Sequence, residues 1–375
     1  MKPIEIRAGY IPLLDCALLV VAAEQGFAAE EGLELRLVRE TSWANIRDRM
    51  GVGHFDVAHM LAPMPIAATL GLAPLPTPML APIALGRGGN TVTVSTGLFR
   101  EMREQGFDRE GPREAGASLR HVIAARRAGG GDLLRFGVVH PHSSHNYDLR
   151  YWLAASGIDP ATEIEITVIP PPFMADALAA GHIDGFCAGE PWGTVAVAAG
   201  AGRIVTTKAE IWPRSPEKVL GVSERFAAEH PDAVAGLVRA LAHAASWCDE
   251  PANHPVLIDL LGAASRLDVD ASLLRPALTG DLMIEPDRVR HVEEFVVFGR
   301  HGANRPEPRH AGWLFSQMAR WGDATMSDDS RRRAIAVFRP DIFESALQKS
   351  PIASLLAAPI APAQDPGEPD DLFDR

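Results

Sequence analysis

The N-terminal stretch Met1-Lys2-Pro3-Ile4-Glu5-Ile6-Arg7-Ala8-Gly9 begins the pattern that decides the fold. From Ile4 to Ala8 apolar and charged residues alternate, which is the two-residue period of a β-strand. A helix is predicted over residues 16–31, with Asp15 as its N-cap and Gly32 at its end. The same alternation continues with strands over 33–38 and 56–59 and helices over 43–50 and 63–70. This βαβαβα order predicts a mostly parallel sheet with helices on its faces.

A second alternating run of strands and helices begins near residue 135. Its predicted strands are 135–139, 164–169, 184–188 and 203–206, and its predicted helices are 145–156, 174–180 and 191–199. A strand over 219–222 follows, and then the predicted helices 231–248, 255–261, 270–274, 285–298 and 312–321. We therefore predict two lobes, formed by residues 1–88 plus 216–350 and by residues 89–215. Residues 351–375 hold five prolines and five acidic residues, which predicts a mobile acidic tail.

Composition excludes several classes of protein. The chain has 375 residues, 47% of them hydrophobic and 22% charged, which is ordinary for a packed globular protein. With 36 Lys+Arg against 48 Asp+Glu, the formal charge is −12, so there is no basic surplus to neutralise nucleic-acid phosphates. Cys16, Cys187 and Cys248 are far apart and form no CxxC pair, which argues against a disulfide framework or a zinc knuckle.

Several blocks, in the same order over residues 4–340, carry a specific resemblance. They are Gly9-Tyr10-Ile11-Pro12-Leu13 with Asp15, Thr41-Ser42-Trp43, His59-Met60-Leu61-Ala62-Pro63, His145 with Leu149-Arg150-Tyr151-Trp152, Phe186-Cys187-Ala188-Gly189-Glu190-Pro191-Trp192, and Pro216-Glu217-Lys218. In these blocks the chain resembles the nitrate/bicarbonate-type substrate-binding proteins of ABC importers, the NrtA/CmpA group. The resemblance implies an α/β, periplasmic-binding-protein-like (type II) fold. It would have two lobes of mixed or mostly parallel sheets flanked by helices, with the ligand in the cleft between them.

The start of the chain indicates which kind of protein within this group the chain resembles more. No uninterrupted apolar segment with a small-residue cleavage site precedes the first strand, and no stretch reaches the ~18 apolar residues of a membrane span. We therefore expect a cytoplasmic protein similar to the nitrate/nitrite sensors of the NasS type. Those sensors hold an RNA-binding antiterminator of the NasT (ANTAR) type, which implies that protein as a partner, with no direct contact to nucleic acid or membrane.

The predicted ligand-binding residues are Trp43, Asn90, His145 and Lys218. Nitrate is a flat monoanion, so its site needs positive potential and several N–H donors, which helix N-termini also supply. Trp43, Pro63, His145 and Glu190–Pro191 fall at predicted strand-to-helix junctions, where such donors gather. The lysine and histidine that match Lys218 and His145 contact the anion in nitrate-binding relatives. Asn90 stands where those relatives carry a glutamine, so it keeps the amide donor on a shorter arm.

The remaining predicted residues line the cleft: Asp15, His59, Pro63, Glu190, Pro191 and Trp192. Each prediction competes with a plainer reading, in which Trp43 fills the core, Lys218 is solvated and His145 is a neutral cap. Three histidines in six residues, His140, His142 and His145, also allow a metal site, although no supporting HExxH or nearby cysteine occurs. We predict no metal and no cofactor.

Three functions compete at this point. The favoured one is the cytoplasmic nitrate/nitrite sensor that releases its antiterminator when the anion binds, and the second is an importer's receptor for nitrate, nitrite or bicarbonate. The third is a metal- or pyrimidine-precursor-handling enzyme on the same scaffold. It is the weakest, because no GxSxG, P-loop or Rossmann motif occurs and Gly86-Arg87-Gly88-Gly89 has the wrong spacing. We therefore predict a binding protein and not an enzyme.

Overall fold

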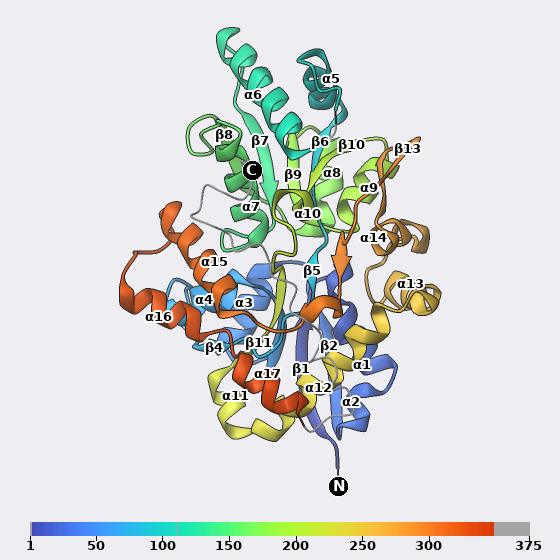
Figure 1. Cartoon of the computed structure of the whole chain (residues 1–375), viewed down its shortest axis with the longest axis vertical. Helices are drawn as coiled ribbons and strands as arrows, with labels where there is room; N and C mark the ends of the chain where they lie inside the picture. The colour runs from blue at the N-terminus through green and yellow to red at the C-terminus, as the bar shows by residue number, and fades with distance from the viewer. Residues whose placement is uncertain (1, 110, 349–375) are drawn as a thin grey trace. The chain divides into compact units, whose positions relative to one another are not determined.

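The computed structural model describes residues 2–109 and 111–348, and it divides into two compact units (Figure 1). Unit 1 contains residues 2–87, 214–271 and 296–348. Unit 2 contains residues 88–109, 111–213 and 272–295. The predicted acidic tail over 351–375 lies outside the described residues.

Unit 1 is built on a five-stranded sheet in the order β2-β1-β3-β11-β4. Its strands are β1 (Ile4–Tyr10), β2 (Leu33–Arg39), β3 (Val57–Leu61), β4 (Met79–Leu80) and β11 (Lys218–Ser223). β1 runs parallel to β2 and β3, whereas β11 runs antiparallel to β3 and β4. The C-terminal ends of β1 and β3 therefore share one edge of the sheet with the N-terminal end of β11, where Lys218 stands.

Helices cover the sheet of unit 1. They are α1 (Ala17–Glu24), α2 (Phe27–Glu30), α3 (Trp43–Gly51), α4 (Pro63–Leu70), α11 (Glu224–Glu229), α12 (Pro231–Cys248), α13 (His254–Gly262), α15 (Pro308–Arg320), α16 (Asp328–Ala336) and α17 (Pro340–Leu347). The long α12 packs on α1, α2 and α17 through a face of buried Ala, Val and Leu, as Figure 1 shows for α1 and α2. Short segments complete the unit: the 3₁₀ turns η1 (Leu14–Cys16), η3 (Pro251–Asn253) and η5 (Arg300–Gly302), and strands β5 (Arg87–Gly88), which ends in unit 2, and β14 (Val296–Val297).

Unit 2 repeats the plan with a five-stranded sheet in the order β10-β6-β9-β7-β8. Its strands are β6 (Asn90–Ser95), β7 (Leu134–Val138), β8 (Ile164–Val168), β9 (Gly185–Gly189) and β10 (Gly202–Thr207). β7 runs parallel to β8 and β9, and β6 runs antiparallel to β9 and β10. The N-terminal end of β6 therefore meets the C-terminal ends of β7, β9 and β10 at one edge.

The helices of unit 2 connect these strands. They are α5 (Thr96–Glu104), α6 (Pro112–Ala128), α7 (Ser144–Ala155), α8 (Met174–Ala179), α9 (Trp192–Ala198), α10 (Lys208–Ile211) and α14 (Arg275–Thr279), with the 3₁₀ turns η2 (Pro171–Phe173) and η4 (Ala271–Leu273), which begins in unit 1, at or near their ends. No helix among residues 2–109 and 111–348 combines the length and the apolar composition that crossing a bilayer requires.

The segment around residues 281–291 differs from the prediction in two ways. The predicted helix over 285–298 is wrong, because β12 (Asp281–Glu285) and β13 (Arg288–His291) form an antiparallel hairpin there. Pro286 and Asp287 make the turn, and Leu282 and Ile284 alternate as buried residues along β12. The placement of residues 272–295 in the first lobe is also wrong: they belong to unit 2, where β12 packs on α9 and β10.

The predicted helix over 16–31 is interrupted, and Asp15 does not cap it. Gly26 takes a φ of 83°, which separates α1 from α2. Asp15 lies inside the 3₁₀ turn η1, and the residue before α1 is Cys16, which makes no side-chain cap. The carboxylate of Asp15 is instead engaged with other side chains. Ser42, in contrast, does cap α3, because its hydroxyl accepts a hydrogen bond from the Asn45 amide at 3.2 Å.

Candidate functional site

Four predicted residues come together in unit 1 at the shared edge of β1, β3 and β11. Asp15 follows β1, His59 lies on β3, and Lys218 opens β11, paired in register with Leu61. Trp43 is the first residue of α3, just after β2. We call Asp15, Trp43, His59, Glu217 and Lys218 the lysine cluster. The Lys218, His59 and Trp43 side chains have no exposure to solvent, and that of Asp15 is 17% exposed.

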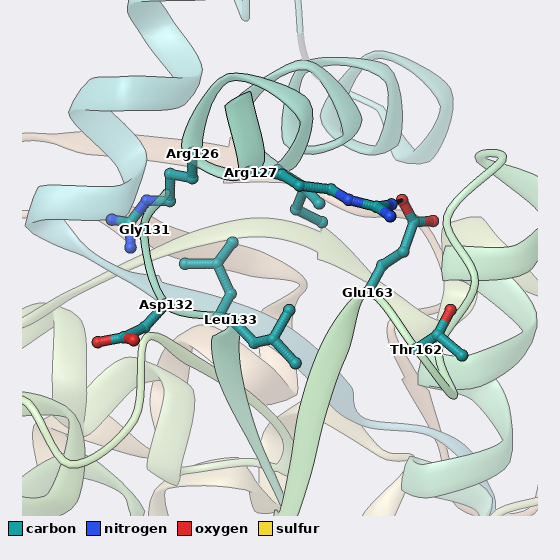
Figure 2. A pocket seen from close by; sticks show the side chains of 9 residues that line it. Arg126, Arg127, Gly131, Asp132, Leu133, Thr162 and Glu163 are labelled. Atoms are coloured by element: carbon teal, nitrogen blue, oxygen red, sulfur yellow. Dashed lines mark ion pairs between the residues drawn. The ribbon is translucent and has the colours of Figure 1, made fainter. Parts of the chain in front are cut away.

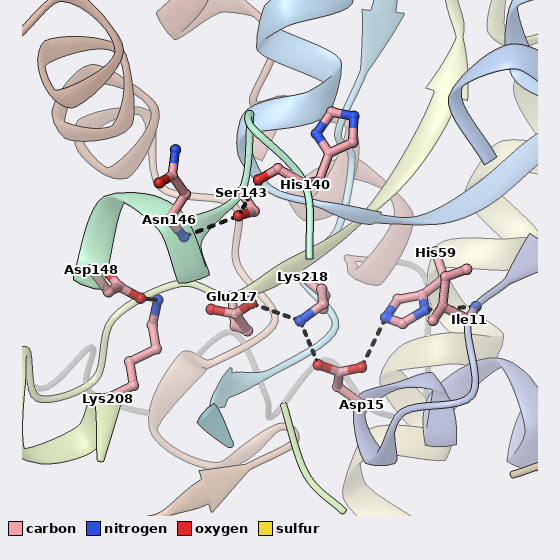
Figure 3. Close-up of polar contacts among 10 residues, drawn as sticks. All are labelled: Ile11, Asp15, His59, His140, Ser143, Asn146, Asp148, Lys208, Glu217 and Lys218. Atoms are coloured by element: carbon pink, nitrogen blue, oxygen red, sulfur yellow. Dashed lines mark hydrogen bonds and ion pairs between the residues drawn. The ribbon is translucent and has the colours of Figure 1, made fainter. Parts of the chain in front are cut away.

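The carboxylate of Asp15 bridges two nitrogen atoms of the lysine cluster. Its Oδ2 lies 2.7 Å from Nζ of Lys218 and its Oδ1 lies 3.0 Å from Nε2 of His59 (Figure 3). The Ile11 backbone amide donates to Nδ1 of His59 at 3.5 Å. Since Nδ1 accepts this bond, the hydrogen of the neutral imidazole belongs on Nε2, which faces Asp15.

Lys218 has two further neighbours within the lysine cluster. Its ammonium donates a hydrogen bond to Oε1 of Glu217 at 2.6 Å, and it lies 5.7 Å from the centroid of the Trp43 ring system. The indole also meets His59 edge to face at 5.2 Å. Among the described residues, Nε1 of Trp43 has no hydrogen-bond partner although it is buried. A buried N–H donor without a partner is costly, which makes it a candidate for contact with a ligand.

The electrostatics of the lysine cluster follow from burial and pairing. Burial tends to raise the pKa of Asp15, but Lys218 and His59 outweigh it and lower the pKa to about 2. Burial tends to lower the pKa of Lys218, but Asp15 and Glu217 outweigh it and raise the pKa. Burial lowers the pKa of His59, and Asp15 opposes this only in part. The imidazole is therefore neutral near pH 7, whereas Lys218 and Asp15 are charged.

In unit 2, Asn90 and Glu190 lie next to each other at the edge where β6 begins. Asn90 pairs in register with Gly189, and the Glu190 amide donates to the Gly89 carbonyl at 2.9 Å. Asn90 is fully buried, and neither atom of its amide group has a hydrogen-bond partner among the described residues. An amide that can both donate and accept is thus unsatisfied here.

Glu190 is a buried carboxyl group with neutral partners. Its Oε1 accepts from the Thr91 hydroxyl and its Oε2 from the Thr194 amide, each at 3.2 Å. Burial raises its pKa to about 7, although the bonds from Thr194 and Thr91 act in the opposite direction. Its peptide bond to Pro191 is cis, and Trp192, a buried residue that is 6% exposed, begins α9. Glu190 therefore holds the start of α9.

The predicted histidine of unit 2 lies where the sequence places it. His145 is the second residue of α7 and is fully buried, one residue after the helix start at Ser144. The two neighbouring histidines serve the loop before α7: His140 Nδ1 accepts from the His142 amide at 3.1 Å, and His142 Nδ1 lies 3.2 Å from the Tyr147 hydroxyl. No group of three or more His, Cys, Asp or Glu side chains within residues 2–109 and 111–348 is arranged to hold a metal ion.

Three residues of these polar clusters were not predicted as site residues from the sequence. Glu217 is 2% exposed and pairs with Lys218. In unit 2, Lys208 and Asp148 form an ion pair at 2.5 Å with side chains 1% and 2% exposed, between the start of α10 and α7 (Figure 3). The sequence signal that could have identified Lys208 is its place at the first position of a helix that directly follows a strand. Pro63, predicted to line the cleft, is the buried first residue of α4.

A surface pocket of unit 2 contains none of the predicted residues. It is lined by Ile123, Arg126, Arg127, Gly131, Asp132, Leu133, Leu134, Thr162 and Glu163. Arg127 reaches toward Glu163, 3.8 Å away (Figure 2), and Arg126 pairs with Glu101 at 2.5 Å. Both arginines therefore face carboxylates, and the pocket is a weaker candidate for an anion than the lysine cluster.

Comparison with known proteins agrees with this architecture. A model of the NMT1-like family matches residues 1–262. The chain is 31% identical over 352 residues to the nitrate/nitrite binding protein NrtA of Synechococcus elongatus, covering 91% of this chain and 77% of that protein. The crystal structure of the periplasmic nitrate-binding protein NrtA from Synechocystis gives a TM-score of 0.89 at 25% identity, covering 100% of this chain and 98% of that chain. The predicted two-lobe, periplasmic-binding-protein-like fold and the resemblance to the NrtA/CmpA group are confirmed.

Some relatives are much longer than this chain. The chain is 34% identical over 353 residues to the bicarbonate transport ATP-binding protein CmpC of Synechococcus elongatus, covering 93% of this chain but 50% of that protein. It spans about half the length of such ATP-binding relatives. By their names, these relatives bind or transport nitrate, nitrite or bicarbonate.

Proposed function

Because the chain belongs to the NMT1-like family, and its relatives along most of its length bind or transport nitrate, nitrite or bicarbonate, we propose that it binds nitrate or nitrite. The observation that carries this proposal is the lysine cluster of unit 1, where a buried ammonium stands beside a buried indole N–H and an imidazole. A flat monoanion with weakly basic oxygens suits these donors and the flat indole face. The function is binding, without turnover of the ligand.

The chemistry of the lysine cluster supports a small planar anion in particular. The ammonium of Lys218 supplies the charge, and hydrogen bonds in which one partner is ionised are roughly twice as strong as neutral ones. Nε1 of Trp43 is a directional donor without a partner among the described residues. In unit 2 we propose Asn90 and His145 as ligand-binding residues, with support from the unsatisfied amide of Asn90 and from the resemblance.

Titration calorimetry of the whole chain with nitrate, nitrite, bicarbonate and chloride tests the ligand. We expect saturable binding of nitrate or nitrite by the wild type and its loss in Lys218→Met. Binding of bicarbonate alone would overturn the choice of ligand. Nitrate affinity that is unchanged in a folded Lys218→Met variant would remove Lys218 from the site.

We further propose that binding is a signal, and that the chain is a cytoplasmic nitrate/nitrite sensor. In its ligand-free form it would hold an RNA-binding antiterminator of the NasT type, and the anion would release that protein. Release needs only a difference in the affinity of the two conformations for the partner. Support comes from the resemblance to NasS-type sensors and from the net charge of −12, which suits a basic, RNA-binding partner.

A pull-down of the purified chain with its antiterminator, with and without nitrate, tests the sensor proposal. We expect a complex that nitrate dissociates, and Lys218→Met should keep the complex while losing its response to nitrate. A complex that nitrate leaves intact in the wild type contradicts the switching mechanism. Fractionation of cells tests the location, since a periplasmic pool of the chain contradicts a cytoplasmic sensor.

A second candidate function is favoured by the names of the relatives. CmpC and NrtC are named as ATP-binding proteins of bicarbonate transport and nitrate import. The chain would then present its anion to an ABC importer in place of a regulator. Co-purification with permease subunits, together with uptake that depends on the chain, would favour this alternative over the sensor.

A further inference from the structure

The ammonium of Lys218 is already occupied by carboxylates of the same chain. Asp15 lies 2.7 Å and Glu217 2.6 Å from Nζ, so two of the three N–H donors are engaged. With His59 neutral, the formal charges of the lysine cluster are +1 for Lys218 and −1 for each carboxylate, which gives −1 in total. A monoanion added to this arrangement would enter a site of its own sign.

The Asp15 carboxylate has the shape of the proposed ligand. A carboxylate, nitrite and nitrate are all planar and present two oxygens on one central atom. Asp15 places one oxygen 2.7 Å from Nζ of Lys218 and the other 3.0 Å from Nε2 of His59 (Figure 3). A single nitrate or nitrite with two oxygens in those places would meet the same two nitrogens.

We propose that Asp15 is an internal competitor, whose carboxylate occupies the position of the anion on Lys218 and His59 and is displaced when the anion binds. This inference rests on the proposed function, and it makes Asp15 the residue that sets the affinity of the site. Displacement exchanges one monoanion for another beside Lys218, so the charge next to the ammonium is conserved.

Asp15 is better placed to leave than the other carboxylate. Its side chain is 17% exposed, whereas that of Glu217 is 2% exposed. It also lies in the three-residue turn η1, outside the sheet. Glu217 directly precedes β11, and its carbonyl accepts a hydrogen bond from the Ala62 amide at 3.1 Å. Asp15 can therefore rotate toward solvent while Glu217 stays beside Lys218 as the permanent counter-ion.

The test is the nitrate affinity of Asp15→Asn, measured by titration calorimetry. The substitution keeps the shape of the side chain and removes its charge, so we expect nitrate to bind about tenfold more tightly or better than in the wild type. Glu34→Gln removes one charge from an exposed position on β2, where the side chain is 49% exposed, and should leave the affinity within twofold. This control separates local displacement from the change in net charge.

The outcomes distinguish this inference from the proposed function. If neither wild type nor Asp15→Asn binds nitrate or nitrite, the proposed function fails. If the wild type binds nitrate and a folded Asp15→Asn variant binds it equally or more weakly, Asp15 only positions Lys218 and His59. The proposal that Asp15 competes with the anion then fails.

A measurement on the wild type covers the case in which Asp15→Asn does not fold. Carboxyl carbon NMR follows Asp15 directly, with its signal assigned in the ligand-free protein. We expect that signal to move to the position of a solvated aspartate on saturation with nitrate. A signal that stays in place while calorimetry shows saturation would overturn the proposal.

Discussion

Asp15 in unit 1 and Glu190 in unit 2 are carboxyl groups shielded from solvent, and their pKa values move in opposite directions. The pKa of Asp15 is lowered to about 2 and that of Glu190 is raised to about 7. Burial raises the pKa of both. Asp15 faces the ammonium of Lys218, whereas the described partners of Glu190 are the hydroxyl of Thr91 and the amide of Thr194.

The comparison shows what a buried cation adds that neutral donors do not. Hydroxyl and amide donors satisfy the oxygens of Glu190, yet they do not compensate for the removal of its charge from water. Lys218 provides this compensation for the charge of Asp15. The buried ammonium of Lys218 depends in turn on the carboxylates of Asp15 and Glu217. At Lys218, unit 1 thus has a charged site that can exchange one anion for another, whereas Glu190 in unit 2 is an acid with neutral described partners that holds the start of α9.

Among the substitutions that test this comparison, Lys218→Met should have the largest effect. It leaves Asp15 and Glu217 close together without their cation, so we expect the free energy of unfolding to fall by about 3–5 kcal/mol. Chemical denaturation measures the loss. Lys2→Met removes an exposed lysine and should change the stability by less than about 0.5 kcal/mol. A loss below about 1 kcal/mol for Lys218→Met would mean that the three charges do not depend on one another.

Glu190→Gln should remove a pH dependence of stability. The folded chain holds the Glu190 proton more tightly than the unfolded chain does, so the free energy of unfolding falls as pH rises from about 4.5 to about 7. A shift of this size corresponds to at most about 3 kcal/mol. Relative to the wild type, Glu190→Gln should gain up to that amount between these pH values.

Denaturation curves at several pH values measure this effect. Glu165→Gln changes an exposed acid on β8 and should keep the pH slope of the wild type. A Glu190→Gln variant whose pH slope equals that of the wild type would show that Glu190 is ionised at the same pH in the folded and unfolded chains.

Gly193→Ala should disturb the surroundings of Glu190 by crowding. A Cβ at this second position of α9 would overlap the Thr91 hydroxyl and lie 2.5 Å from Oε1 of Glu190. We expect a loss of about 1–3 kcal/mol in the free energy of unfolding. Gly97 is the second residue of α5, and a Cβ there would have only Ser95 Oγ nearby, at 3.8 Å, so Gly97→Ala is the matched control and should not destabilise. Equal effects of the two substitutions would mean that the surroundings of Glu190 are not tightly packed.

Trp43→Phe should give the smallest of these effects. The quantity that it changes is the affinity for the ligand. The phenyl ring keeps a flat face beside Lys218 but removes the indole N–H, so nitrate should bind roughly fivefold more weakly, equivalent to about 1 kcal/mol. Calorimetry measures the change. Trp247→Phe alters a half-buried tryptophan of α12 outside the lysine cluster and should leave the affinity unchanged. An unchanged affinity in Trp43→Phe would assign the indole to packing alone.

The order of strands and helices could be predicted because it depends on local periodicity. The hairpin over 281–291 could not, because its short strands pack on α9 and β10, which are far away in the sequence. Lys218, His59 and Trp43 were predicted as site residues, and the structure places them together in unit 1. Asp15 was predicted both to cap a helix and to line the cleft; the cap is wrong, and the partners of Asp15 lie on β3 and β11. Only tertiary structure could show that.

NMR of the lysine ammonium groups tests the central claim, that Lys218 binds the anion, most directly. The chain has only four lysines, at positions 2, 208, 218 and 349, so a protein labelled with ¹⁵N at lysine Nζ gives few signals. The Lys218 signal is assigned by its absence from Lys218→Met. During a nitrate titration it should shift and saturate with the dissociation constant that calorimetry gives, while the signal of Lys2 stays in place. A Lys218 signal that does not move when calorimetric binding is complete would contradict the account.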